Sequence, residues 1–164
     1  MFLKSKALIA SSIALALLLV TSLTSCKKCT FGEDTVGGIV LEDVSVFPLS
    51  GYMTGNMGSD YHIDSSHNLA SYYEISSDAG ITRTAVDYNT YSILANPAIV
   101  PCEAAFDRTV TIDSINMLIT YDLTIKVCKD SKCAETRSVE NYVAVPAFSS
   151  ANYSVTYNQI VVEQ

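Results

Sequence analysis

The sequence INMLITYDLTIKV, residues 115–127, carries the clearest secondary-structure signal in the chain. Apolar side chains recur there at every second position, and the positions between them are mostly polar. The apolar set is Met117, Ile119, Tyr121, Leu123, Ile125 and Val127, and it alternates with Leu118, Thr120, Asp122, Thr124, Lys126 and Cys128. A period of two residues predicts a β-strand with one buried face and one face in water. Because most strands are shorter, we expect a bend or bulge within it.

Shorter segments of the same kind lie on both sides of this one. We expect strands at 39–49, 81–86, 88–94, 109–112, 136–145 and 153–162, and a strand or short helical turn at 68–76. Turn formers such as Asp78-Ala79-Gly80 and Asn96-Pro97 separate them. The pattern predicts one all-β domain over residues 39–164, an antiparallel β-sandwich of immunoglobulin-like type. A small barrel or jelly roll is the alternative.

The composition agrees with a β fold and narrows the choice of partners. The chain has ten tyrosines, no tryptophan, and many of the Val, Ile and Thr residues that favour strands. Its formal net charge is −7 over 164 residues, and it becomes −9 without Lys4 and Lys6. An acidic domain of this kind lacks the positive surface that nucleic-acid phosphates require. It is also repelled by anionic lipid headgroups, so any membrane contact should be made through an attached lipid.

The first 25 residues have the order of a secretory signal peptide. Lys4 and Lys6 form a short basic head, residues 7–20 are almost wholly apolar, and small residues follow. An apolar run of about 14 residues falls short of the roughly 20 that a membrane-spanning helix needs. We therefore expect residues 1–25 to be cleaved, the alternative being an uncleaved membrane helix.

The end of this segment, Leu23-Thr24-Ser25-Cys26, resembles the lipobox of bacterial lipoproteins. The resemblance implies cleavage before Cys26, a diacylglycerol on its sulfur and, usually, an acylated amino terminus. Two or three acyl chains hold a protein firmly to a bilayer. The residue after the cysteine is Lys27 rather than the Asp that tends to retain such proteins in the inner membrane. The resemblance thus implies the outer membrane, on either its periplasmic or its cell-surface face.

Residues 26–38 are predicted to form a lipidated tether, because they are polar, contain the Gly37-Gly38 pair and show no periodicity. Four more cysteines follow Cys26, and in an oxidising compartment an even number favours disulfides. Cys128 and Cys133 flank a four-residue loop between two predicted strands, so they could face each other across a hairpin. That pairing would leave Cys29 with Cys102.

Asp60, His62, Asp64 and His67 are the only concentration of metal-capable side chains, and they include both histidines of the chain. Imidazole and carboxylate together could hold zinc or a similar ion. With no further histidine available, we instead expect a solvated acidic loop without metal or cofactor. The chain also lacks the G-x-S-x-G motif of many serine hydrolases.

These observations favour a non-enzymatic, lipid-anchored binding or structural module of the cell envelope. In its signal and general composition the chain resembles the small β-rich lipoproteins of Gram-negative bacteria. An envelope protein or a glycan would be its partner. The first alternative is a carbohydrate-binding lipoprotein that uses a tyrosine-bearing face or the loop at 51–66. The second alternative is a small metal-dependent hydrolase built on the Asp60–His67 loop.

Overall fold

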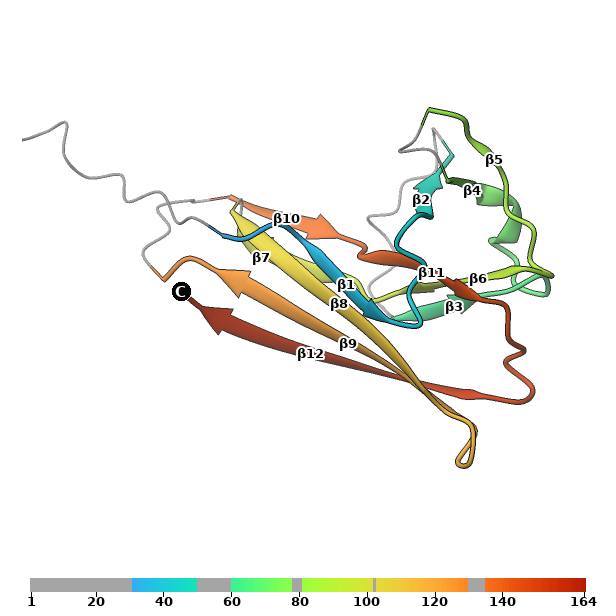
Figure 1. Cartoon of the computed structure of the whole chain (residues 1–164). Helices are drawn as coiled ribbons and strands as arrows, with labels where there is room; N and C mark the ends of the chain where they lie inside the picture. The colour runs from blue at the N-terminus through green and yellow to red at the C-terminus, as the bar shows by residue number, and fades with distance from the viewer. Residues whose placement is uncertain (1–30, 50–59, 78–80, 102, 130–134) are drawn as a thin grey trace, which may run out of the picture.

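The computed structural model describes residues 31–49, 60–77, 81–101, 103–129 and 135–164 (Figure 1). Among them are twelve strands, one 3-10 turn and no α-helix. The strands are β1 Thr35–Gly38, β2 Ser45–Pro48, β3 Tyr61–Ile63, β4 Tyr73–Ser76, β5 Thr84–Ala85, β6 Tyr91–Ala95, β7 Ala98–Pro101, β8 Ala104–Asp113, β9 Leu118–Val127, β10 Thr136–Val139, β11 Tyr142–Pro146 and β12 Ser154–Glu163, and the turn is η2 Ala70–Tyr72. The all-β prediction is confirmed.

The strand predicted within residues 115–127 is β9, an inner strand of a four-stranded sheet in the order β1-β8-β9-β12. β8 and β9 form an antiparallel hairpin whose register runs without interruption from Ala104–Val127 to Asp113–Leu118. The predicted bend or bulge is therefore absent from β9. At the hairpin tip, a carboxylate oxygen of Asp113 accepts hydrogen bonds from the amides of Ile115 and Asn116. These bonds close the turn and hold the register.

The outer strands of this sheet run parallel to their neighbours. β1 pairs with β8 from Thr35–Asp107 to Gly38–Val110, and β12 pairs with β9 from Ser154–Leu118 to Glu163–Val127. Parallel neighbours need long connections rather than hairpins. β12 fits this rule because it follows β11, which belongs to another sheet. The sheet thus has an antiparallel centre and parallel edges.

A second layer covers one face of this sheet and makes the molecule a sandwich (Figure 1). It consists of the antiparallel sheets β11-β6-β3 and β10-β7. The two layers share one core cluster, to which the four-stranded sheet contributes Val110, Ile119, Tyr121, Leu123 and Ile125, and the second layer Leu94, Val100, Val143 and Val145. Burying each such side chain contributes about 1.5–3 kcal/mol. No closed barrel forms in the described part of the chain.

A further antiparallel sheet, β2-β4-β5, stands at one end of the sandwich, the end where the β8–β9 hairpin tip also lies (Figure 1). A smaller core of Ile63, Tyr73 and Ile93 joins this sheet to the second layer. The start of β1 and the carboxyl terminus both lie at the opposite end (Figure 1). The two ends of the described chain therefore share one end of the molecule.

The predicted tether is wrong for residues 35–38, which form β1. Gly37 and Gly38 suggested a flexible linker, but Gly38 has φ +71°, and a Cβ there would lie 1.9 Å from the carbonyl oxygen of Val110. Glycine is needed here for a close approach between backbones. Asp34 also accepts hydrogen bonds from the amide of Phe106 and from Arg108, each at 3.0 Å. The described end of the predicted tether is therefore attached to the four-stranded sheet from Asp34 onward.

Two other predicted strands are interrupted. The segment 39–49 contains a turn in which the amide of Val44 donates to the carbonyl of Leu41, and only Ser45–Pro48 continues as β2. The segment 136–145 breaks at Asn141, whose φ is 50°. Asparagine tolerates this left-handed conformation better than most residues. The break sends β10 and β11 into different sheets.

Candidate functional site

The predicted acidic and histidine loop lies in and just after β3. The ring of His62 stacks on Phe148 with centroids 4.1 Å apart and planes inclined by 10°. Nδ1 of His67 accepts a hydrogen bond from the amide of Leu69 at 3.2 Å. One oxygen of Asp64 accepts from the amide and hydroxyl of Ser66, and the other accepts from the Ser150 hydroxyl. The loop is held by these local bonds, while Asp60 is exposed.

These side chains do not converge on one point. Across the described ranges, no three His, Cys, Asp or Glu side chains lie close enough together to hold a metal ion. Nε2 of His62 is buried and has no hydrogen-bond partner. The hydrolase alternative therefore has no assembled centre in this part of the chain.

We expect His62 to make folding stability depend on pH. Its pKa lies below the ordinary value of 6.5, mainly because burial disfavours the imidazolium. Below pH 6.5 the His62 side chain therefore binds more protons in the unfolded chain than in the folded chain. The stability that neutral His62 contributes is complete above pH 6.5 and is lost as the pH falls toward the lowered pKa. Urea denaturation between pH 7.5 and pH 5 should show this loss in the wild type.

The variant His62→Phe keeps a ring against Phe148 but removes the titrating group, so it should show a shallower loss over the same pH range. Equal pH dependence in the wild type and His62→Phe would contradict the assignment.

Three tyrosine hydroxyls meet where β3, β4 and β11 come together. The hydroxyl of Tyr61 lies 3.1 Å from those of Tyr73 and Tyr142, which are themselves 3.5 Å apart. Burial raises the pKa of Tyr61 and Tyr142 well above the usual range. Among the described tyrosines, only Tyr72 is classed as exposed, at 43%. The hydroxyl cluster of Tyr61, Tyr73 and Tyr142 thus belongs to the packed interior and forms no exposed tyrosine-bearing face, in line with the ordinary strand packing that the alternation of tyrosine with threonine and serine indicates.

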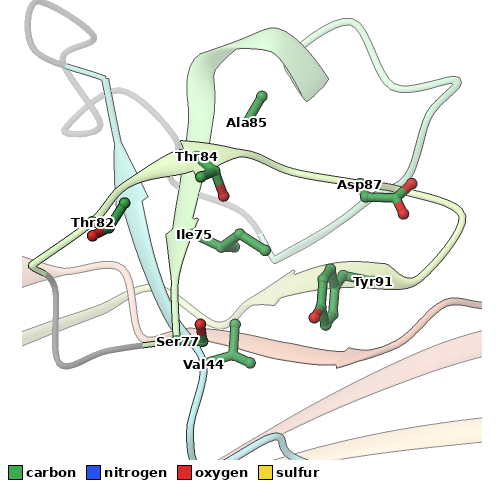
Figure 2. Close-up of a pocket in the computed structure, with 8 residues that line it drawn as sticks. All are labelled: Val44, Ile75, Ser77, Thr82, Thr84, Ala85, Asp87 and Tyr91. Atoms are coloured by element: carbon green, nitrogen blue, oxygen red, sulfur yellow. The ribbon is translucent and has the colours of Figure 1, made fainter.

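A cavity of about 400 Å³ opens between the β2-β4-β5 sheet and the start of β6. Figure 2 shows the side chains of Val44, Ile75 and Tyr91 below the strand that carries Thr84. The other lining residues are Ser77, Thr82, Ala85 and Asp87. The volume lies within the range of small-molecule sites. The cavity thus presents aliphatic side chains and the Tyr91 ring beside the hydroxyl groups of Ser77, Thr82 and Thr84.

The carboxylate of Asp87 at this rim is already engaged. It accepts hydrogen bonds from the amide and side chain of Asn89 and from the hydroxyl of Thr90. Chiefly the Thr90 bond holds the pKa of Asp87 below its usual value. No lysine or arginine lines the cavity. A neutral ligand suits this site better than an anion.

A smaller cavity of about 300 Å³ lies beside β1 and is lined by Arg108 and Tyr142 among mostly aliphatic residues. The Arg108 guanidinium there donates to Oδ1 of Asn141 from Nε and Nη2, at 3.2 and 2.9 Å. It also forms an ion pair with Asp34 at 3.0 Å. Arg108 therefore ties β1 to the break between β10 and β11.

Glu140, next to this network, should be a source of instability. Glu140 is 8% exposed, its Oε2 has no hydrogen-bond partner, and burial raises the pKa of its carboxyl group. Glu140→Gln is expected to stabilise the fold at pH 7 by about 1 kcal/mol, because it removes a poorly solvated charge. The gain should shrink as the pH falls toward the ordinary value of 4.5, because the raised pKa lets Glu140 take up a proton in the folded state before it does so in the unfolded chain. Urea denaturation of both proteins at pH 7 and pH 5 checks this, and an unchanged difference would contradict it.

The cysteines can be placed only in part. Cys128 follows β9 and is disulfide-bonded. Cys26, Cys29, Cys102 and Cys133 lie outside the described residues, so the lipid attachment and the disulfide pairing stay predictions. In the described part of the chain, no helix has the length and apolar character needed to cross a membrane.

The sequence predicted neither the cavity nor the role of Asn141 at the break between β10 and β11. The cavity draws residues from four separate segments, none of which carries a motif. Comparisons with protein-family models, curated proteins and solved structures found no match for this chain.

Proposed function

We propose that this protein is a non-enzymatic module of the bacterial cell envelope, anchored to the outer membrane by lipid on Cys26. The observation that carries the proposal is Leu23-Thr24-Ser25-Cys26, which follows a signal-like segment and precedes an acidic β-sandwich. Residues 27–34 can span at most about 28 Å, so the domain would remain close to the bilayer.

Mass spectrometry of the protein purified from its own membranes tests the anchor. We expect an amino terminus at Cys26 that carries a diacylglycerol thioether. The variant Cys26→Ala should lack the lipid and leave the membrane fraction. An intact Met1 together with an unmodified Cys26 thiol would overturn the proposal.

The second candidate, binding of a neutral sugar, has one specific observation in its favour. The cavity offers the ring of Tyr91 and aliphatic side chains to the C–H face of a sugar, and hydroxyls that can both donate and accept hydrogen bonds. Titrating the protein with glucose, galactose, mannose and N-acetylglucosamine, each separately, should shift the amide NMR signals of Thr84 and its neighbours.

Two substitutions locate that binding. Thr84→Trp should fill the cavity and abolish the shifts, whereas Thr111→Trp, on an exposed part of β8, should leave them unchanged. If none of the four sugars shifts the cavity signals, the sugar candidate is wrong, and the lipid-anchor proposal is unaffected.

A further inference from the structure

β12 presents an unusually open sheet edge. It pairs with β9 along ten residues, and no other described strand lies on its far side. Its consecutive residues Ile160, Val161 and Val162 are 58%, 61% and 39% exposed. Natural edge strands are commonly protected by lysine, proline, bulges or short length. β12 has none of these, and Glu163 is its only charged residue.

Two backbone hydrogen bonds show which groups of β12 lie on its free edge. The amide of Ser154 donates to Met117, and that of Gln164 donates to Val127, both in the direction of β9. Along a strand, the backbone groups of successive residues point alternately toward the neighbouring strand on one side and toward the other side. The N–H and C=O groups of the even-numbered residues therefore point toward β9, and those of the odd-numbered residues 155–163 point outward. Val155 and Tyr157 also pack against the core cluster, so odd-numbered side chains lie on the core side.

We propose that this edge binds β12 of a second copy of the chain, in antiparallel orientation and centred on Gln159. Only odd-numbered residues have free backbone groups, so each must lie opposite an odd-numbered residue of the second copy. When the pairing is centred on Gln159, all five odd-numbered residues from 155 to 163 form hydrogen bonds on both chains. The four-stranded sheets would join into one sheet of eight strands, with both core faces on the same side.

The side chains of β12 are self-complementary in this register. Exposed Val161 lies opposite Tyr157 of the second copy, and Glu163 lies opposite Val155, so no like charges meet across the strands. Cross-strand pairs of β-branched and aromatic residues stabilise such ladders. The net negative charge of the whole chain opposes association. We therefore expect the pairing to strengthen as added salt screens that repulsion.

Cysteine cross-linking in membranes tests the register directly. Gln159→Cys should form a disulfide dimer, because opposite residues of antiparallel strands lie within disulfide reach. Glu163→Cys alone should not cross-link, but copies carrying Glu163→Cys should link to copies carrying Val155→Cys. Mass spectrometry of the linked peptides separates these bonds from those of the native cysteines. No linkage at Gln159→Cys, or equal linkage of Glu163→Cys with itself, would overturn the proposal.

Proline substitution tests the backbone argument in the protein purified in detergent. Val161→Pro removes an outward N–H that has no part in the β9 ladder, so the melting temperature should hardly change. Dimerisation measured by sedimentation should weaken at least about tenfold, because two symmetric hydrogen bonds are lost. Val161→Thr keeps the N–H and a β-branched side chain, and it should still dimerise. Unaltered self-association of Val161→Pro would exclude the pairing.

Discussion

Replacing Asn141 with alanine is expected to lower the free energy of unfolding by about 3–4 kcal/mol. Asn141 is 3% exposed, and its Oδ1 accepts two hydrogen bonds from Arg108. Its Nδ2 donates to the carbonyls of Asn96 and Val139. Alanine would leave these groups unpaired in a largely buried site and would place a less tolerant residue at φ 50°. Urea denaturation at pH 7 measures the change.

Two further substitutions at this position separate the causes. Asn141→Gly tolerates the left-handed backbone but lacks the amide, whereas Asn141→Asp keeps an oxygen acceptor for Arg108 and loses the two donated bonds. We expect Asn141→Asp to be the least destabilised of the three variants. A loss below about 1 kcal/mol in Asn141→Ala would show that the network contributes only as much as a single ordinary hydrogen bond.

Gly38→Ala is expected to detach β1 from β8. The added Cβ would lie 1.9 Å from the Val110 carbonyl oxygen, a backbone atom held in the centre of the sheet. The left-handed conformation adds about 1–2 kcal/mol of strain. The amide of Ile39, which donates to that same carbonyl at 2.8 Å, should lose its protection. Hydrogen exchange of residues 35–39 by NMR checks this result.

The neighbouring glycine supplies the matched control. At Gly37 a Cβ would meet only the Thr109 side chain, at 3.4 Å, which is ordinary contact. Gly37→Ala should therefore keep both the protection of Ile39 and the melting temperature. Equal exchange rates in the two variants would show that β1 is not held by the close approach at Gly38.

Part of the fold was predictable because its signal is local. The alternation of Ile119, Tyr121, Leu123 and Ile125 within one short segment is enough to specify β9 and its buried face. The parallel pairing of β12 is not encoded locally, because it depends on which sheet the preceding strand joins. The break at Asn141 was missed for a similar reason. The side chain of this residue is held by Arg108, which lies 33 residues earlier in the sequence.

The candidate sites show the same limit. His62 and His67 are close in sequence, but spacing does not give the direction of a ring, and their rings stack on different partners, Phe148 and Tyr61. The cavity brings together Val44, Ile75, Thr84 and Tyr91, which only tertiary packing can make neighbours. The N-terminal motif is different, because the lipidation it predicts depends on linear order alone, and that lipidation stays a prediction.

The shared location of the two chain ends has a consequence for how a paired molecule would rest on a membrane. In an antiparallel β12 pair, the ends that carry the connections from Cys26 point away from each other. Ten residues of strand span about 33 Å, similar to the reach of residues 27–34. Both anchors can enter the same leaflet only if the long axis of the pair lies along the bilayer plane. The dimer would then lie flat along the membrane surface, with one lipid anchor at each end.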